Sequence, residues 1–356
     1  MQRYIYLLLI LSISIFPHNF QLNTVISGLR SPWGFCFKSQ KHILITEKQG
    51  KINQLDLTNN SLQNIDHNLN ILVHGQGGLL DIVYHNDYVY VTFSENRGKN
   101  TSSTSIARAK YSPLKMNFKT IFRAEPAIES GYHFGSRIAI KDDHIYASIG
   151  ERGQGMIAQD GRSHPGSIIR IRLDGTIPTD NPIFTTKPNW QPEIYQIGIR
   201  NPQGMAYSPL DQHIYMTNHG AKGGDWFGRA EKGGNYGWKI LGWGGTNYSG
   251  LPIGPKWKDG FTKPIHYWTP SIAVSSLVIY RGEAFSNWTG HALIGSLKDR
   301  SLRKLVFNQT TTLNESILFK GTIGRIRDIK IQPETGYIFL LDGSGRLWQM
   351  TPKNEY

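Results

Sequence analysis

The sequence predicts an all-β fold, on three observations. First, 38 glycines and 17 prolines are spread along 356 residues and separate many short runs of β-branched and aromatic residues. Second, no long helical stretch is apparent. Third, one strand-like run recurs six times along the chain. Six four-stranded units that close into a ring form a six-bladed β-propeller, which we predict as one domain over residues 21–356.

The repeats divide the chain into the predicted blades. The recurring runs occupy residues 42–46, 88–92, 144–148, 213–217, 291–295 and 337–341. A polar turn precedes most of these runs, and another apolar strand lies before that turn. A third strand often follows the run. The spacing of roughly 45 to 80 residues is wide for a blade, so we expect inserted loops within residues 150–198 and 220–271. A β-sandwich, the rival architecture, does not need six similar units, and ring closure also removes exposed sheet edges.

The first 20 residues predict a secretory signal peptide without a recognisable cleavage site. Met1-Gln2-Arg3 carries positive charge, and the apolar run over residues 4–16 is too short for a membrane span. An uncleaved anchor stays open as the alternative, and no second membrane segment follows. Cys36 is the only cysteine, so no internal disulfide can form. Export without disulfides indicates a periplasmic or secreted protein of a bacterial envelope.

The formal net charge is +13, but Lys and Arg are dispersed along the chain. A nucleic-acid-binding protein would cluster basic residues on one element with interleaved aromatics, so we expect no nucleic-acid partner. A basic surface suits anionic small molecules or an acidic redox partner.

Candidate functional residues stand where the inner strands of four repeats begin. They are Gln76, His133, Arg200 with Asn201, and Arg325 with Arg327. In a propeller, such positions converge on the central channel. A buried guanidinium such as that of Arg200 needs either a structural carboxylate or a bound anionic ligand. Three guanidiniums at one mouth repel one another, and Asp328 neutralises only part of that charge, so a multiply anionic ligand is the simpler partner.

The motifs along the chain carry a family resemblance. In order they are SPWGF (31–35), GQGGLLD (75–81), HFGSRI (133–138), AQD (158–160), HPGSIIRI (164–171), DGTIPTDNP (174–182), RNPQG (200–204), NYGW (235–238), PSIAVSS (270–276) and GRIRD (324–328). With these motifs the chain resembles the soluble glucose dehydrogenase and aldose sugar dehydrogenase family, which uses pyrroloquinoline quinone (PQQ). The resemblance spans roughly residues 29–352.

The resemblance implies PQQ-dependent oxidation of aldose sugars at the anomeric hydroxyl to lactones, with hydride transfer to the quinone. His133 matches the family's base, and a neutral imidazole is competent near pH 7. Arg200 matches the arginine beside the quinone oxygens, where preorganised positive charge assists catalysis. Asn201 would bind the same cofactor edge.

The resemblance also implies residues that hold the ligands. Arg325 and Arg327 match the pair that grips the cofactor carboxylates, and Lys298 and Ser271 match further cofactor contacts. A solvated surface lysine is the alternative for Lys298. Gln76 is expected to face the sugar, with a structural turn role as its alternative.

Calcium is the second implied cofactor. The main-chain carbonyls of Gly220 and Ala221 match its donors, and oxygen ligands suit this hard cation. Trp226 occupies the position where the family often has an acidic residue of a second, structural calcium site, so we do not expect that second ion. Trp226 either stacks on a sugar at the site rim or packs on a neighbouring blade.

Two other functions stay open beside the dehydrogenase. One is a ligand- or protein-binding propeller without redox activity, suggested by the altered loop at Trp226. The other is a calcium-dependent lactonase, which needs carboxylates converging on a metal in the channel. The sequence names neither the sugar, nor the electron acceptor, nor the oligomeric state.

Overall fold

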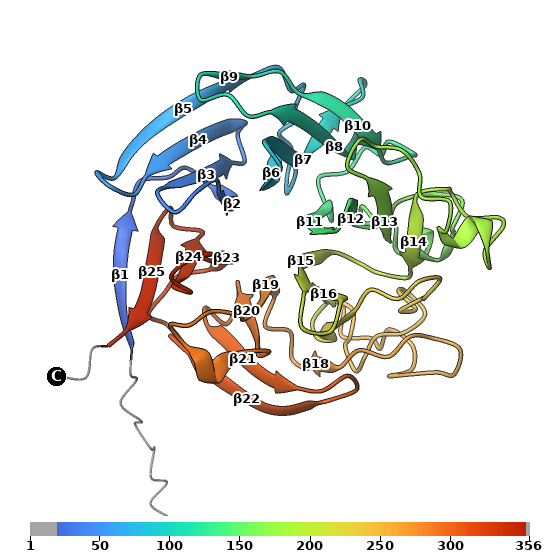
Figure 1. Ribbon diagram of the computed structural model, residues 1–356. Coiled ribbons are helices and arrows are strands. Elements are labelled where there is room, and N and C mark those ends of the chain that lie inside the picture. Colours follow the sequence, from blue (N-terminus) through green and yellow to red (C-terminus); the bar gives the residue numbers. More distant parts are fainter. Residues whose placement is uncertain (1–19, 354–356) are drawn as a thin grey trace, which may run out of the picture.

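The computed structural model describes residues 20–353 and confirms the six-bladed β-propeller. Six sheets stand around a common axis, along which the central channel of a propeller runs (Figure 1). Five of the sheets have four strands, and one gains a short fifth strand, β9 (Lys115–Met116), which pairs in parallel with that blade's outer strand. Residues 1–19 of the predicted signal peptide lie outside the described residues, whereas residue 20 already belongs to the propeller.

In five blades, the strands follow one another outward from the channel in chain order. From the innermost strand, these blades are β2 (Pro32–Phe37), β3 (His42–Glu47), β4 (Lys51–Asp56) and β5 (Ser61–His67); β6 (Leu79–His85), β7 (Tyr88–Asn96), β8 (Ser102–Lys110) and β10 (Lys119–Arg123); β11 (Gly135–Lys141), β12 (His144–Ile149), β13 (Ser167–Arg172) and β14 (Ile194–Ile197); β15 (Pro202–Ser208), β16 (His213–Asn218), β17 (Asp225–Arg229) and β18 (His266–Trp268); β19 (Val274–Ile279), β20 (Ala292–Ser296), β21 (Leu302–Phe307) and β22 (Thr312–Leu318). The recurring runs of the sequence are the second strands of the blades.

The sixth blade joins the two ends of the chain. Its inner strands are β23 (Ile326–Ile331), β24 (Ile338–Asp342) and β25 (Leu347–Pro352), and its outer strand is β1 (Phe20–Ile26), which pairs with β25 antiparallel. Figure 1 shows the blue β1 beside the red β25. Because the first and last described strands pair in one sheet, this blade closes the ring.

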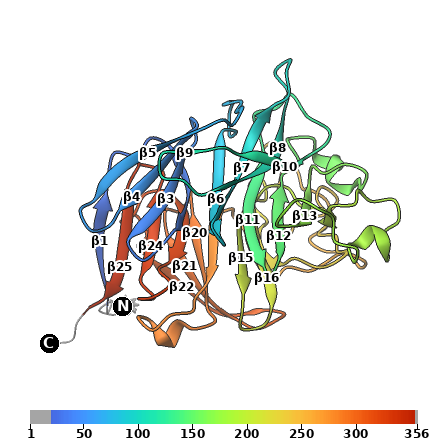
Figure 2. The ribbon, with the colours of Figure 1, turned by 45° about the horizontal axis from the view of Figure 1, so that its top comes forward.

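Inserted segments surround one part of the ring. They include the single turns η1 (Gly155–Gln159) and η2 (Pro182–Phe184), while η3 (Ser286–Trp288) lies in the fifth blade. Figure 2 shows the loops of the third and fourth blades projecting on the same side of the ring. Within residues 20–353, no helix has the length and hydrophobicity needed to cross a membrane.

A repeated hydrogen bond links neighbouring blades. Near the end of four second strands, a buried hydroxyl donates to a carbonyl of the next blade's inner strand. The pairs are Thr46 with Leu80 at 2.5 Å, Thr92 with Ser136 at 2.6 Å, Ser148 with Pro202 at 3.4 Å, and Thr217 with Ser275 at 2.6 Å. The recurring Thr or Ser of the sequence repeat therefore holds the blades at a fixed distance around the channel.

The fifth blade makes the same link from a different residue. Gly295 stands where the other blades have Thr or Ser, and a Cβ there would lie 2.5 Å from the Ser275 hydroxyl. That hydroxyl donates to the carbonyl of Ile326 in the next blade at 2.6 Å. A side chain at Gly295 would displace the group that makes the link, which accounts for glycine in the otherwise β-branched pattern.

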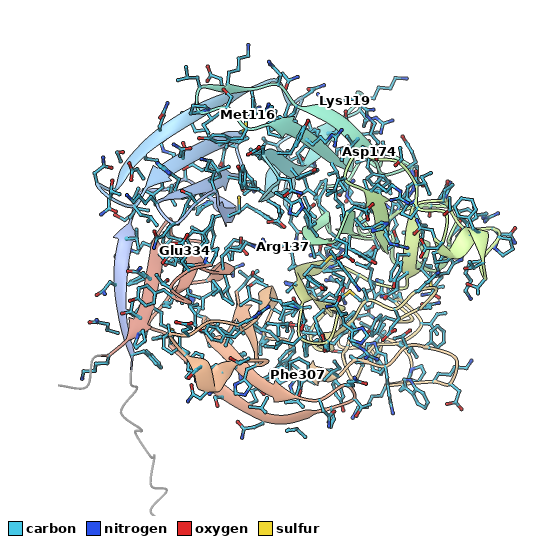
Figure 3. All side chains as sticks on the ribbon, viewed as in Figure 1. Met116, Lys119, Arg137, Asp174, Phe307 and Glu334 are labelled. Atoms are coloured by element: carbon cyan, nitrogen blue, oxygen red, sulfur yellow. The ribbon has the colours of Figure 1, made fainter. Side chains whose placement is uncertain are left out.

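A buried ion network closes the centre of the ring. Arg137 is 2% exposed and lies beside the central channel (Figure 3). Its Nη1 is 3.0 Å from Asp81 and 3.1 Å from Asp328, and its guanidinium also donates to the carbonyls of Gln203 and Arg327 at 2.7 Å each. Arg137 thus ties four blades together at the axis. The charge of Asp328, which the sequence suggested for the channel-mouth arginines, is engaged mainly with Arg137.

Candidate active site

A cavity of about 280 Å³ opens at one mouth of the central channel. Gln76, His133, Arg200 and Arg325 stand just before β6, β11, β15 and β23, and all of them line this cavity. The starts of four inner strands therefore meet at one end of the channel. Asn201 and Arg327, which lie next along the same segments, also line the cavity.

Four cationic side chains line the cavity, and none of the described residues that line it carries a carboxylate. The cations are Lys48, Arg200, Arg325 and Arg327. Burial, together with the nearby charges of Arg137 and Arg325, lowers the pKa of Arg327 to about 10. Burial and the charge of Arg327 lower the pKa of Lys48. The cations therefore repel one another, and an anionic ligand with several charges would relieve this repulsion.

Arg200 is a buried cation of the cavity wall that has no ion pair with any described residue. It is 6% exposed, and among residues 20–353 its guanidinium has no carboxylate partner. Its Cζ lies 5.4 Å from the centre of the Trp238 ring, which offers a cation–π contact but no neutralisation. Of the two partners that the sequence left open for this arginine, the structural carboxylate is absent from the described residues. The arrangement favours a bound anion.

His133 is held by a carboxylate that sequence reasoning missed. Its Nδ1 forms a short hydrogen bond with Glu151, whose other oxygen accepts the amide of Gly155 at 2.6 Å. Burial lowers the pKa of His133, the Arg200 and Arg152 charges lower it further, and Glu151 opposes them. Burial raises the pKa of Glu151, but the bond from His133 keeps it below its usual value. A neutral imidazole that donates Nδ1–H to the carboxylate keeps Nε2 free to accept a proton.

Two amides fix the backbone around the histidine. The Gln76 side-chain oxygen accepts the amide of His133 at 2.8 Å, and the Asn201 side-chain oxygen accepts the amide of Gly135 at 3.0 Å. Gln76 therefore has a structural contact as well as its place in the cavity wall. Its side-chain nitrogen keeps its donor capacity for a ligand.

Four of the predicted site residues do not line the cavity. The hydroxyl of Ser271 donates to Asp225 at 2.6 Å, and Lys298 is exposed, although the neighbouring Leu297 lines the wall. Gly220 and Ala221 lie in the turn after β16, where the amide of Gly220 donates to Asp225 at 2.8 Å. The predicted cofactor contacts of Ser271 and Lys298 stay predictions.

The turn at Gly220 and Ala221 is chemically compatible with a calcium ion. Within the described residues, neither carbonyl oxygen accepts a hydrogen bond, so both keep the lone pairs that Ca²⁺ would need. The same part of the chain contains no cluster of three or more His, Cys, Asp or Glu residues that could hold a metal through side chains. A site here would depend on carbonyl and ligand oxygens, and it lacks the carboxylates of a calcium-dependent lactonase.

Of the two alternatives for Trp226, the place at the site rim is wrong and the packed position is the one observed. Trp226 lies in β17, is 2% exposed and stacks on Tyr236 with ring centres 4.1 Å apart. Its large apolar surface packs in a core cluster formed by residues of the third and fourth blades, so the side chain is buried and does not reach the cavity. Its place in the core gives the tryptophan a structural role, so the altered loop is no argument against a redox function.

The lining residues that the sequence did not predict for the site include four with side chains suited to ligand contacts. They are Trp33, Lys48, His219 and Tyr248. Trp33 lies at the start of β2, an inner strand like those that follow Gln76, His133 and Arg200, so the position of its motif at a strand entrance is the signal that indicates it. Tyr248 is 70% exposed on an inserted loop, and no local pattern in the sequence brings that loop to the channel.

Residues 29–349 match the family described as Glucose / Sorbosone dehydrogenase. The chain is 31% identical to aldose sugar dehydrogenase YliI of Escherichia coli over 354 residues, which cover 95% of this chain and 94% of that protein. It is 25% identical to quinoprotein glucose dehydrogenase B of Acinetobacter calcoaceticus, over 91% of this chain and 85% of that protein.

The fold is also similar to solved structures. The apo-form of the soluble aldose sugar dehydrogenase from Escherichia coli superposes with a TM-score of 0.87 at 30% identity, over 94% of this chain and 99% of that chain. The PQQ-bound aldose sugar dehydrogenase from Streptomyces coelicolor has a TM-score of 0.77 at 23% identity, over 93% of this chain and 98% of that chain.

Proposed function

The chain belongs to the Glucose / Sorbosone dehydrogenase family, and we propose that it oxidises an aldose sugar at the anomeric hydroxyl to the lactone, with PQQ as its redox cofactor. The observation that carries this proposal is the cavity at the channel mouth. It combines a carboxylate-bound histidine with four cationic side chains and no carboxylate among its described lining residues.

The cations fit the proposed cofactor. PQQ carries three carboxylates, and when bound it supplies an ortho-quinone that takes up the hydride released by the sugar. Arg325 and Arg327 present forked donors suited to carboxylates, and Lys48 adds a point charge. Lys298 directly follows the wall residue Leu297, and we propose that its flexible side chain adds a further cation to the bound cofactor. Anion binding would replace the mutual repulsion of these groups by attraction.

His133 is the proposed general base. Its Nε2 takes the proton of the anomeric hydroxyl while the adjacent carbon is oxidised. Glu151 holds the ring by Nδ1 and stabilises the imidazolium that forms, and the lowered pKa of His133 keeps the resting ring neutral. The proton therefore moves to an atom that is already oriented and already free to accept it.

Arg200 is the proposed electrophilic group. Its guanidinium has no ion pair among the described residues, although the Glu151 charge acts on it at longer range, and it lies in the wall of the same cavity as His133, where negative charge grows during sugar oxidation. Asn201 is bound through its side-chain oxygen to the amide of Gly135, so its side-chain nitrogen is the group that remains for the cofactor. Gln76 offers its side-chain nitrogen to the sugar in the same way.

Calcium is part of the proposal at one site. The carbonyl oxygens of Gly220 and Ala221 would be its protein ligands, and Asp225 shapes their turn through the amide of Gly220. We infer no second calcium ion near Trp226, because that side chain is buried in the core. We also propose that the protein acts in the bacterial envelope and passes its electrons to an acceptor outside the chain.

Reconstitution tests the proposal. Purified apoprotein is loaded with PQQ and Ca²⁺, cofactor binding is measured by calorimetry, and dye reduction is followed with several aldoses. We expect tight cofactor binding, sugar-dependent dye reduction and formation of the lactone. A His133→Ala variant should bind PQQ like the parent and lose turnover by about 100-fold or more. Folded protein that binds PQQ without oxidising any aldose would refute the proposed reaction.

A further inference from the structure

Arg152 is a buried arginine without a carboxylate partner in the described part of the chain. It is 1% exposed, and it directly follows Glu151, the residue that holds the imidazole of His133. Burying a guanidinium without an ion pair is costly unless its donors are satisfied by other groups. The neutral groups that accept hydrogen bonds from the Arg152 guanidinium indicate its role.

The guanidinium binds the chain on both sides of His133. Its Nε donates to the carbonyl of Tyr132 at 3.0 Å, and Nη2 forms a short hydrogen bond with the carbonyl of Ser130. Its Cζ lies 3.8 Å from the centre of the Phe134 ring. In addition, the backbone amide of Arg152 donates to the carbonyl of His133 at 3.2 Å. Arg152 therefore contacts the segment that carries the proposed base at three places: before His133, at His133 and after His133.

The rest of the guanidinium is anchored in a neighbouring blade. Nη1 donates to the carbonyl of Ser102 at 2.7 Å, and Nη2 reaches the hydroxyl of the same residue at 3.2 Å. Ser102 is buried at the start of β8 and paired there with β7. The loop before His133 is thus tied to a sheet of the propeller, not to another loop.

His133 needs this support because its backbone is strained. Its φ of +50° lies in the left-handed region, which a non-glycine residue adopts at a cost of about 1 kcal/mol or more. A Cβ on Gly150, the residue before Glu151, would lie 2.0 Å from the carbonyl oxygen of His133, so the turn is packed tightly against it. Loosening the loop would let His133 relax away from its present place in the cavity wall.

We propose that Arg152 is a positioning residue for the base of the reaction: it locks residues 130–134 to the sheet so that His133 keeps its imidazole at the cavity and at Glu151. This inference rests on the proposed function, because it takes His133 as the base. Arg152 itself does not line the cavity, so it acts only through His133.

The charge of Arg152 adds to its mechanical role. The groups that face His133 are Glu151, which favours the protonated ring, and Arg200, Arg152 and His219, of which the two arginines lower the pKa of His133. Removing the Arg152 charge should raise the pKa of His133, whereas loss of the hydrogen bonds alone should not. Two variants separate these effects.

The variants are Arg152→Met, which removes the charge and the donors, and Arg152→Lys, which keeps the charge but replaces the fork by one ammonium. The matched control is Arg170→Met. Arg170 is a 9% exposed arginine of β13, in the same blade as Arg152, and it pairs with Asp180 at 2.9 Å and does not line the cavity. It therefore measures what the loss of a buried arginine costs in stability alone.

Three measurements are made on each folded variant: kcat and KM with PQQ, the pH profile of kcat/KM, and the pKa of His133 by NMR of labelled histidine. We expect both Arg152 variants to lose kcat by about 10- to 100-fold with little change in KM. The acid limb of the pH profile and the NMR pKa should move to higher pH in Arg152→Met only, and Arg170→Met should keep the parent kcat.

The NMR measurement separates this inference from the proposed reaction, because it needs neither sugar nor PQQ. If the parent fails to oxidise sugars but the His133 signals shift and broaden in Arg152→Met, the reaction is wrong and the positioning role stands. Folded Arg152 variants that keep the parent kcat, or a folded Arg152→Met variant whose His133 signals and pKa match those of the parent, would overturn the positioning role.

Discussion

The Nδ1 atom of His133 and a carboxylate oxygen of Glu151 share a short hydrogen bond beside the channel. The two residues come from opposite ends of the β11–β12 hairpin, His133 before its first strand and Glu151 after its second. Antiparallel pairing brings these ends together, since Gly135 lies opposite Ile149. The β11–β12 hairpin therefore places the proposed base and its orienting carboxylate side by side.

Replacing Glu151 by Gln should lower kcat by about 100-fold. A glutamine can donate its amide to Nδ1, which favours the ring tautomer whose Nε2 already carries a proton. Loss of the carboxylate should also lower the pKa of His133 further, so the acid limb of kcat/KM should move to lower pH. Steady-state kinetics across pH measures both effects. The exposed Glu129 provides a control, and a Glu129→Gln variant with the same loss would argue against a specific role for Glu151.

Arg327→Met should weaken PQQ binding by about 10- to 100-fold, because a charge-assisted contact is lost. The substitution should cause no electrostatic loss of stability in the apoprotein, because Arg137 and Arg325 repel Arg327 when no anion is bound. Calorimetric titration and chemical denaturation measure the two quantities. Arg346→Met, at an exposed position of the same blade, should leave PQQ affinity unchanged. Parent-like affinity in Arg327→Met would remove this residue from the proposed cofactor site.

The repeat pattern was sufficient to predict the propeller and the convergence of the inner-strand entrances, because each blade is a local unit of nearby strands. The residues that it missed depend on contacts between distant segments. Glu151 has no motif that marks it as a partner of His133, and Tyr248 reaches the cavity through an inserted loop. The position of Trp226 could not be decided from the sequence for a related reason, because its stacking partner Tyr236 is brought to it only by the tertiary structure.

Arg137→Met should destabilise the protein by about 3–5 kcal/mol. The variant leaves Asp81 and Asp328, both buried, without the guanidinium that joins them. Equilibrium denaturation in urea measures the loss. The comparison is Arg172→Met, whose partner Asp143 is more than half exposed, and its expected cost is about 1 kcal/mol or less. Equal losses in both variants would show that the central network contributes no more than a surface pair.

His219 should make the protein less stable as the pH falls below about 6.5. Burial lowers the pKa of His219 to about 4, the Asp225 charge opposes this, and Arg200 and His133 lower it further. Between pH 6.5 and about 4 the unfolded chain binds a proton at this residue that the folded protein excludes, so the free energy of unfolding falls over that window.

His219→Gln removes the titration, and the loss of stability from pH 7 to pH 4.5 should shrink by about 1 to 3 kcal/mol. His133 also has a lowered pKa and contributes to the loss in both proteins, so the difference between parent and variant reports on His219 and its interaction with His133. An identical loss of stability in parent and variant would mean that His219 titrates in the folded protein as it does in the unfolded chain.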